Sequence, residues 1–166
     1  ALDLPTTIAR INASYGPNGG LPAYHCDAIA AGRLVPLRSP NQSPYSPIHE
    51  DDLAEVLRVC AMNRASGVYN LAGTDTMRWS EMVSAFGRRM VSLPSWAIYP
   101  LTELTWRLRI QNESPAVGLD FIRYPWTVST DKLRRELGIV PVHTSRDAWE
   151  SFALRNQPVP VGGLRT

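Results

Sequence analysis

The sequence contains no apolar run long enough to cross a bilayer, and nowhere does it show the charged, apolar and small-residue succession of a signal peptide. We therefore expect a cytoplasmic protein that does not interact with membranes. A large excess of one charge is also lacking, because the net charge is only +2 and the arginines are scattered rather than gathered in a stripe. Since binding along a phosphate backbone needs such a basic surface, nucleic acid is not an expected partner.

Cysteine and lysine are scarce. The two cysteines, Cys26 and Cys60, each fall in a stretch that is predicted to be an amphipathic helix, so we expect reduced, buried thiols rather than a disulfide. Lys132 is the single lysine among 17 basic residues. Any motif that requires a lysine can therefore be placed only there.

What the sequence does contain suits one compact domain. Its 166 residues are enough for a sizeable core and too few for two ordinary domains. A hydrophobic fraction of 44% with 19% charged residues argues against global disorder. The chain starts at Ala1, directly before an apolar stretch and without a start-up segment, and we expect that it was cut from a longer protein.

Hydrophobic periodicity and turn residues predict a layered α/β fold. Strands are expected at residues 6–11, 34–37 and 67–71. Helices are expected at residues 22–31, 51–63, 96–108, 131–137 and 145–155, and a further helix is expected to begin at Ser80 and to carry Met82, Val83, Phe86 and Met90. The segment 39–47 has three prolines and is predicted to be an exposed loop, and residues 157–166 are predicted to be a flexible tail.

The ends of these helices follow from particular residues. Asp51 or Asp52 can cap the helix at 51–63, since a carboxylate accepts hydrogen bonds from the free backbone N–H groups of the first turn. Gly138 is expected to end the helix at 131–137. Pro100 is expected to start or kink the helix at 96–108, because proline lacks the N–H that an inner turn needs.

Three segments together resemble the extended short-chain dehydrogenases of the NAD(P)-dependent epimerase/dehydratase family, in order and in spacing. Residues 10–17 (RINASYGP) are similar to the family's R-P-x-N-x-Y-G-P, which follows the sixth strand. Residues 48–54 (IHEDDLA) are similar to I-H-V-x-D-L-A and are followed by 67–73 (GVYNLAG), similar to G-x-x-Y-N-L-G. Residues 131–138 (DKLRRELG) with Pro141 are similar to S-K-A-x-x-x-L-G-x-x-P. The resemblance covers nearly the whole chain.

The resemblance implies that this chain is the C-terminal, substrate-binding portion of such an enzyme: a few strands that complete a Rossmann-type sheet, with a small, mainly helical lobe. The cofactor would be NAD or NADP, the partners a small-molecule substrate and the N-terminal half of the same protein, and a homodimer is allowed. The positions expected nearest the nicotinamide are Ile11, Asn12 and Ala13. The positions expected near the substrate are Tyr15, Leu21, Tyr24 and Tyr45. In the family pattern His49 and Asp52 hold a strand-to-helix junction.

Two family motifs are absent. The chain has no G-x-x-G-x-x-G turn of the kind that holds a dinucleotide pyrophosphate. It also has no Y-x-x-x-K, because Val128 stands four residues before Lys132. We therefore expect no catalytic residue in this chain, and we expect it to be inactive by itself and unable to bind NAD(P) tightly. Family order places both motifs in the N-terminal half.

Departures from the pattern bear on the substrate. Where sugar-nucleotide enzymes carry R-D-x-I-H, with the arginine on the diphosphate, residues 45–49 read YSPIH. The family's N-L-x-P is reduced to residues 20–22 (GLP), and the asparagine of N-x-Y-G-P is replaced by Ala13. A substrate other than a nucleotide-diphosphate sugar is therefore favoured, in a pocket lined by aromatic residues unless these belong to the core. The candidates are Trp96, Tyr99, Trp106, Phe121, Tyr124 and Trp126.

Several alternatives stay open. The full protein is expected to be an oxidoreductase, epimerase or dehydratase, but a regulatory or redox-sensing protein of the same fold, or an independent small binding domain, is also compatible with the sequence. A sugar-nucleotide epimerase that uses a different arginine, such as Arg78 or Arg123, is a further alternative. His49 resembles a catalytic base, although a structural role is favoured. No metal site is expected, because His25 and His143 have no cysteine or carboxylate at ligand spacing.

Overall fold

The computed structural model describes residues 5–20, 37–38, 43–87, 91–112 and 114–155. The expected helix at 22–31, with Leu21, Tyr24 and Cys26, lies outside the described residues, as does the tail at 157–166. The described strands are β1 (Thr7–Ile11), β2 (Ser14–Gly16), β3 (Gly19–Gly20), β4 (Leu37–Arg38), β5 (Pro44–Tyr45), β6 (Ile48–His49), β7 (Gly67–Leu71), β8 (Met77–Arg78) and β9 (Val91–Ser92). The described helices are α2 (Glu50–Met62), α3 (Trp79–Ser84), α4 (Ser95–Arg107), η1 (Ala116–Leu119), α5 (Asp120–Arg123), α6 (Asp131–Leu137) and α7 (Ser145–Arg155).

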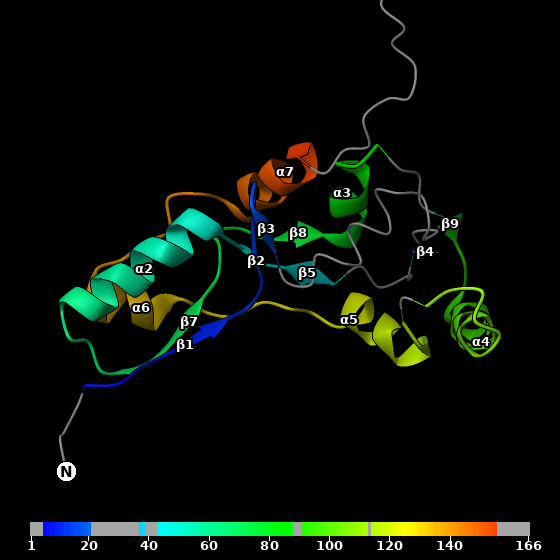
Figure 1. Cartoon of the computed structure of the whole chain (residues 1–166), viewed down its shortest axis with the longest axis horizontal. Coiled ribbons are helices and arrows are strands. Elements are labelled where there is room, and N and C mark those ends of the chain that lie inside the picture. Colours follow the sequence, from blue (N-terminus) through cyan, green and yellow to red (C-terminus); the bar gives the residue numbers. More distant parts are fainter. Residues whose placement is uncertain (1–4, 21–36, 39–42, 88–90, 113, 156–166) are drawn as a thin grey trace, which may run out of the picture.

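Strands β1 and β7 form a parallel pair in which Thr7 lies opposite Gly67 and Ile11 opposite Leu71. Parallel neighbours require a long crossover, and α2 with its flanking segments provides it. Because side chains alternate across a strand, the pair has two faces. One face packs against α2 and α6, which run along it in Figure 1. The other face carries Ile8, which is 54% exposed, so it is open in the part of the chain that the structure describes.

A first hydrophobic core lies between β6, β7, α2 and α6. Val56 and Cys60 on α2 meet Leu71 of β7 and Leu133 of α6, and the side chains of Leu71 and Leu133 are completely buried. The prediction of a helix at 51–63 with one apolar face is therefore confirmed, because the helical spacing of these residues places them on the side of α2 that faces the sheet. Cys60 is a free, buried thiol, as expected.

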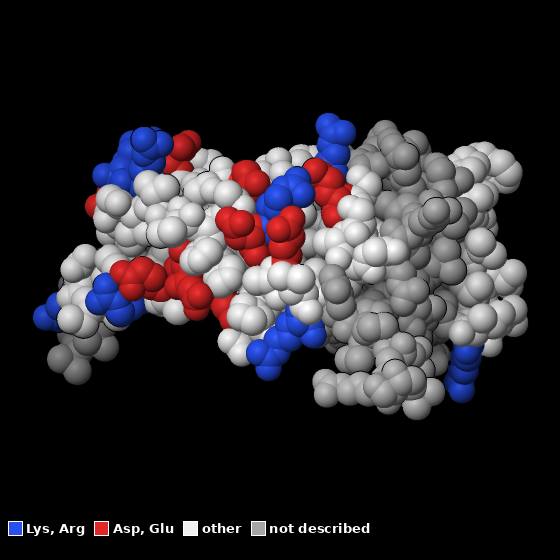
Figure 2. Space-filling view, turned by 90° about the horizontal axis from the view of Figure 1, so that it is seen from above, with Lys and Arg blue, Asp and Glu red and all other residues white. Residues whose placement is uncertain are grey.

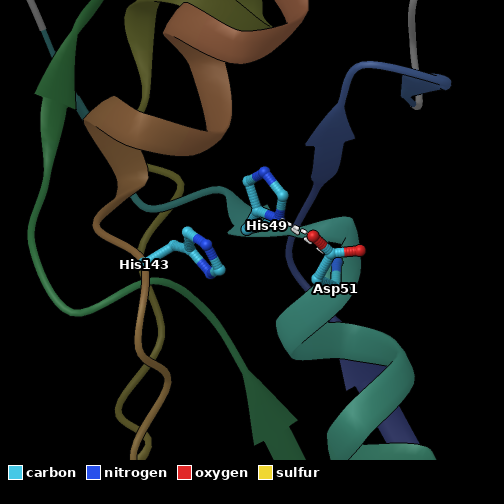
Figure 3. Close-up of side chains that lie close together, drawn as sticks. All are labelled: His49, Asp51 and His143. Carbon is cyan, nitrogen blue, oxygen red and sulfur yellow. Dashed lines mark hydrogen bonds and ion pairs between the residues drawn. The ribbon is translucent and has the colours of Figure 1, made fainter.

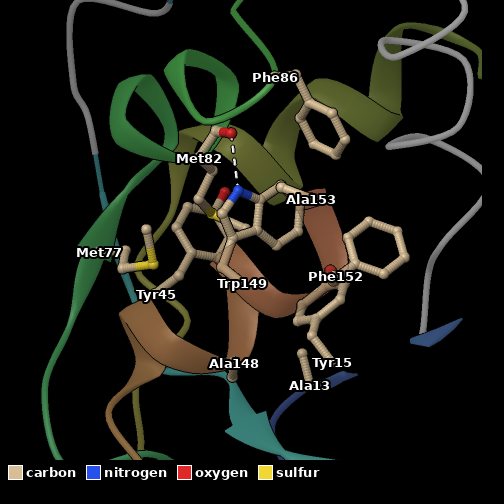
Figure 4. Packing of buried hydrophobic residues seen from close by; sticks show 10 residues of the cluster. All are labelled: Ala13, Tyr15, Tyr45, Met77, Met82, Phe86, Ala148, Trp149, Phe152 and Ala153. Carbon is tan, nitrogen blue, oxygen red and sulfur yellow. Dashed lines mark hydrogen bonds between the residues drawn. The ribbon is translucent and has the colours of Figure 1, made fainter. Parts of the chain in front are cut away.

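A second core surrounds Trp149 of α7 (Figure 4). Its indole ring meets Tyr15 edge-on at 4.7 Å between centroids and lies 5.5 Å from Phe152. The indole N–H donates to the carbonyl oxygen of Met82 on α3 at 2.7 Å, which satisfies the polar atom of a side chain that is 1% exposed. This aromatic cluster joins α7 to α3 and to β2.

The remaining helices form a smaller lobe. Helix α4 packs mainly against η1, and α5 follows η1 directly. The hydroxyl of Tyr99 on α4 donates to the carboxylate of Asp120 at 2.6 Å, and the guanidinium of Arg123 lies over the Tyr99 ring. Burial, helped by Asp120, raises the pKa of Tyr99.

Several predicted boundaries agree with the structure. The strand at 67–71 and the helices at 131–137 and 145–155 match β7, α6 and α7. Gly138 ends α6 with a positive φ of 68°, a conformation that glycine adopts at no steric cost. Of the strand expected at 34–37, the described part is β4.

Other predictions were wrong. The helix expected to begin at Ser80 starts at Trp79 after Arg78 and ends at Ser84, so Phe86 follows it, and Met90 lies outside the described residues. Helix α4 begins at Ser95 and contains Pro100, so the helix does not start at the proline, and a kink there stays a prediction.

The segment 39–47 is not an exposed loop where the structure describes it. Ser43, Tyr45 and Ser46 are buried. Pro44 pairs with Arg78 in the sheet formed by β5 and β8, and its carbonyl oxygen accepts the backbone N–H of Trp126. Proline lacks only a donor, so its carbonyl can still join a strand at a sheet edge. Turn-forming composition was therefore a poor guide in this segment.

The described surface carries both signs of charge. Figure 2 shows arginine and acidic side chains interspersed over the face that it presents. Ion pairs such as Arg58 with Glu55, at 2.7 Å, and Arg146 with Glu81, at 2.7 Å, account for part of this mixing. None of the helices in the described ranges is long and apolar enough to span a membrane.

Candidate functional site

A depression of about 410 Å³ opens where the parallel strands β1 and β7 end. It is lined by Arg10, Ile11, Asn12, Asn70, Pro125, Trp126, Thr127 and Val128. Its volume is in the range of small-molecule sites, and the carboxyl ends of parallel strands are where α/β proteins usually bind ligands. The two strands and the segment 125–128 therefore build one candidate site.

Arg10 and Asn70 lie opposite one another at this end of the pair. Both belong to the open face of β1 and β7, because they stand two positions after Ile8 and Val68 respectively and side chains alternate along a strand. Arg10 is the one ionisable residue of the lining, and among the described residues no carboxylate forms an ion pair with it. The depression thus presents a cationic group beside an amide.

Asn12 forms the junction between the strand end and the opposite wall. Its side-chain nitrogen donates to the carbonyl oxygen of Ser46 at 2.9 Å, to the Ser46 hydroxyl at 3.0 Å and to the carbonyl oxygen of Trp126 at 2.7 Å. Its backbone N–H donates to the carbonyl oxygen of Leu71 at 3.1 Å. The amide donors of Asn12 are therefore used in holding the site together.

The other expected ligand contacts lie deeper. Ala13, Tyr15 and Tyr45 belong to the core around Trp149 and are 9%, 5% and 8% exposed. Burial raises the pKa of the Tyr45 phenol, because its charged form is poorly solvated there. Of the seven positions expected near cofactor or substrate, Ile11 and Asn12 line the depression, and Leu21 and Tyr24 lie outside the described residues. Contact of any of these positions with a ligand stays a prediction.

The sequence motifs contained Arg10 and Asn70 but did not single them out as site residues. Both stand near the end of an expected strand, and this position could have identified them as site residues, because ligands bind at the carboxyl ends of parallel strands. Trp126 was one of the six aromatic candidates for a pocket, whereas Trp96, another of them, is 80% exposed on α4. The position of the segment 125–128 beside β1 had no signal in the sequence, because it depends on contacts between distant residues.

His49 and Asp52 lie at the start of α2, and both are buried. The His49 Nδ1 atom accepts the backbone N–H of Asp51 at 3.2 Å, so histidine caps this helix in place of the expected aspartate. The Asp52 carboxylate accepts the backbone N–H groups of Val142 at 3.0 Å and of His143 at 2.8 Å. These contacts tie the β6–α2 junction to the segment before α7.

The sequence comparisons find relatives but no family. No model of a known protein family matches the sequence. Uncharacterized proteins of Mycobacterium tuberculosis and Mycobacterium bovis are 26% identical over 152 residues, which is 90% of this chain and 39% of theirs. The chain thus spans well under half the length of these curated relatives.

Solved structures of NAD(P)-dependent epimerases and dehydratases share the fold. A human epimerase family protein with NADPH has a TM-score of 0.61 at 17% identity, over 90% of this chain and 48% of its own. The dTDP-glucose 4,6-dehydratase of Bacillus anthracis with NAD has a TM-score of 0.58 at 15% identity, over 93% and 45%. The UDP-N-acetylglucosamine 4-epimerase of Bacillus cereus has 0.56 at 12% identity, over 93% and 47%. The chain has the mixed α/β fold of the C-terminal portion of extended short-chain dehydrogenases.

Proposed function

We propose that this chain is the C-terminal, substrate-binding part of an NAD(P)-dependent oxidoreductase, epimerase or dehydratase that acts on a carbinol or carbonyl carbon. The observation that carries the proposal is the depression at the carboxyl ends of β1 and β7. It lies in a chain that shares its fold with NAD- and NADPH-bound enzymes over less than half of their length. Residues 1–166 would form a single portion of the longer protein.

The open face of β1 and β7 supports a missing partner. Parallel sheets are normally covered on both faces, and a sheet of two strands is too small to be stable by itself. Here Ile8 is 54% exposed on the open face and Ile11, at the end of β1, is 46% exposed, so apolar surface is left in contact with water. The N-terminal half of the full-length protein would cover this surface and extend the sheet beyond β1. It would also supply the glycine-rich turn and the Tyr/Lys pair that this chain lacks.

The lining of the depression fits one end of a dinucleotide with its substrate. Ile11, Trp126 and Val128 offer apolar surface, and Arg10 and Asn70 offer polar groups. When bound, the nicotinamide would accept or return a hydride at the substrate carbon. This chain would orient the ring through Ile11 and Asn12, exclude water with the wall at 125–128, and select the substrate.

The substrate is proposed to be something other than a nucleotide-diphosphate sugar. Tyr45 stands where the sugar-nucleotide enzymes hold an arginine, and its side chain is packed in the core beside Trp79, with ring centroids 6.4 Å apart. A buried, neutral phenol cannot neutralise a diphosphate. Several of the structural neighbours, at least three, bear the names of sugar-nucleotide enzymes, so a different diphosphate-binding residue has to be tested. Arg123, exposed beside Tyr99 and Tyr124, is the candidate for it.

Calorimetric titration of the full-length protein and of the 166-residue chain with NAD⁺ and NADP⁺ tests the proposal. The full-length protein should bind one of them with micromolar affinity, and the 166-residue chain should bind neither tightly. Micromolar binding by the 166-residue chain would overturn the assignment. A full-length protein that binds the cofactor but whose N-terminal half has no Y-x-x-x-K would instead support a regulatory or redox-sensing role.

A further inference from the structure

The two histidines in the described residues meet at the start of α2, although 94 positions separate them in the sequence. The His49 and His143 rings are stacked, with centroids 4.1 Å apart and planes inclined by 19°. Figure 3 shows Asp51 from the first turn of α2 beside His49, and its carboxylate Oδ2 lies 3.5 Å from His49 Nδ1. One donor atom from each of these three side chains lies within 4.8 Å of the other two.

The surroundings of the imidazole nitrogens of His49 and His143 are compatible with binding of a metal ion. The His49 Nδ1 atom accepts a hydrogen bond from the Asp51 backbone, so this nitrogen is unprotonated, and an ion would replace that N–H as the partner of its lone pair. The His143 Nδ1 atom is buried and makes no hydrogen bond, although Asp52 Oδ2 is only 3.2 Å away. A carboxylate beside one nitrogen of an imidazole is also the usual arrangement behind a metal-binding histidine, whose other nitrogen then holds the ion.

Two features of this cluster are unfavourable for a cation: the charge at the helix N-terminus and the orientation of the two rings. The N-terminus of a helix carries partial positive charge, but Glu50, Asp51 and Asp52 all lie in the first turn of α2 and outweigh it. The stacked rings do not direct both lone pairs to one point, so one ring has to rotate. His143 can do so, because its side chain is 38% exposed and lies outside the helices.

We propose that His49, Asp51 and His143 form a zinc-type metal site that ties the start of α2 to the segment before α7. Two imidazoles and one carboxylate are a ligand set that Zn²⁺ accepts, with water in the fourth position. The Asp51 side chain is 74% exposed, so the ion can enter from solvent. Asp52 would act as the positioning residue for the His143 ring. The earlier expectation of no metal was based on spacing along the chain, which cannot detect ligands that the fold brings together.

The test uses the full-length protein after removal of metal with a chelator. Titration with Zn²⁺ should show one site of micromolar affinity, and Co²⁺ should give the visible absorption bands of a histidine-bound ion. His143→Ala and Asp51→Asn should each weaken Zn²⁺ binding roughly tenfold or more, since even outer partners of a metal site have effects of that size. Zn²⁺ should also raise the melting temperature of the unmodified protein and have little effect on that of either variant.

Glu55→Gln is the matched control, because it removes one exposed carboxylate from the same helix without touching the cluster. Its Zn²⁺ affinity should stay within about twofold of the unmodified protein, as exposed charges interact weakly. Asp51→Asn alters an exposed side chain and should fold normally. Absence of stoichiometric Zn²⁺ binding, or Zn²⁺ binding that His143→Ala and Asp51→Asn leave unchanged, would overturn the proposal. Neither result depends on NAD(P) binding, so the proposed function is tested separately.

Discussion

The side-chain amide of Asn12 donates to the carbonyl oxygen of Trp126 at 2.7 Å, although the two residues are 114 positions apart. The same nitrogen reaches the Ser46 carbonyl at 2.9 Å. One side chain thus joins the end of β1 to both segments that border it. The shape of the candidate site depends on this junction more than on any contact within a single element.

Replacement of Asn12 by alanine should therefore destabilise the protein. It leaves the Ser46 and Trp126 carbonyl groups without this donor, and we expect the free energy of unfolding to fall by about 1 to 3 kcal/mol. Urea denaturation measures the change. Asn70→Ala is the control, since Asn70 donates to a single exposed acceptor, the Ser129 carbonyl at 3.2 Å, and should cost less than about 1 kcal/mol. Equal losses of stability in the two variants would show that the Asn12 hydrogen bonds contribute no more than the single exposed hydrogen bond of Asn70.

Replacement of His49 by alanine should lower stability without abolishing catalysis in the full-length protein. The variant loses the cap of α2 and a buried ring contact, and we expect a loss of about 1 to 3 kcal/mol in metal-free buffer. His49→Asn should recover part of this, because asparagine is a good N-cap. Turnover reduced by several orders of magnitude at an unchanged melting temperature would instead identify His49 as a catalytic base.

Tyr45→Arg should not create a sugar-nucleotide site. Tyr45 is 8% exposed among aromatic side chains, so arginine there buries an unpaired charge and the full-length protein should lose stability by more than about 3 kcal/mol. Titration with UDP-glucose should show no gain in affinity over the unmodified protein. Low-micromolar binding of UDP-glucose by the unmodified protein would contradict the proposed substrate class. Arg123 would then be the candidate residue for binding the diphosphate.

Stability should decline at alkaline pH through Tyr45. Its pKa is raised by burial, so the unfolded state loses its phenolic proton first, and stability present below about pH 10 is lost as the pH rises further. Tyr45→Phe removes this titration and should reduce the slope by up to about 1.4 kcal/mol per pH unit. Burial also raises the pKa of Tyr69 and Tyr99, so part of the decline should remain. Unfolding curves of the unmodified protein and of Tyr45→Phe between pH 8 and 11 measure this difference. Equal pH dependence of stability in the two proteins would show that Tyr45 titrates normally.

Local signals in the sequence were sufficient for the longer helices and for the strands β1 and β7. The i, i+3, i+4, i+7 spacing in α2 and the αL glycine after α6 act within a few residues, so they can be recognised without the fold. The same holds for β7, a short apolar strand between turn residues. The order and spacing of the motifs also predicted the α/β fold class.

Only the tertiary structure decided the candidate site and the boundaries that depend on distant contacts. Pro44 and Tyr45 have the local composition of a loop, yet they form a strand because Met77, Arg78 and Trp126 supply its neighbours. His143 meets His49 because α6 and α7 return the chain to the start of α2. Such contacts join residues far apart in the chain, whereas propensity and periodicity act within one or two turns. For that physical reason local sequence determined the longer helices and strands, and packing between distant segments determined the short strands and which side chains share a site.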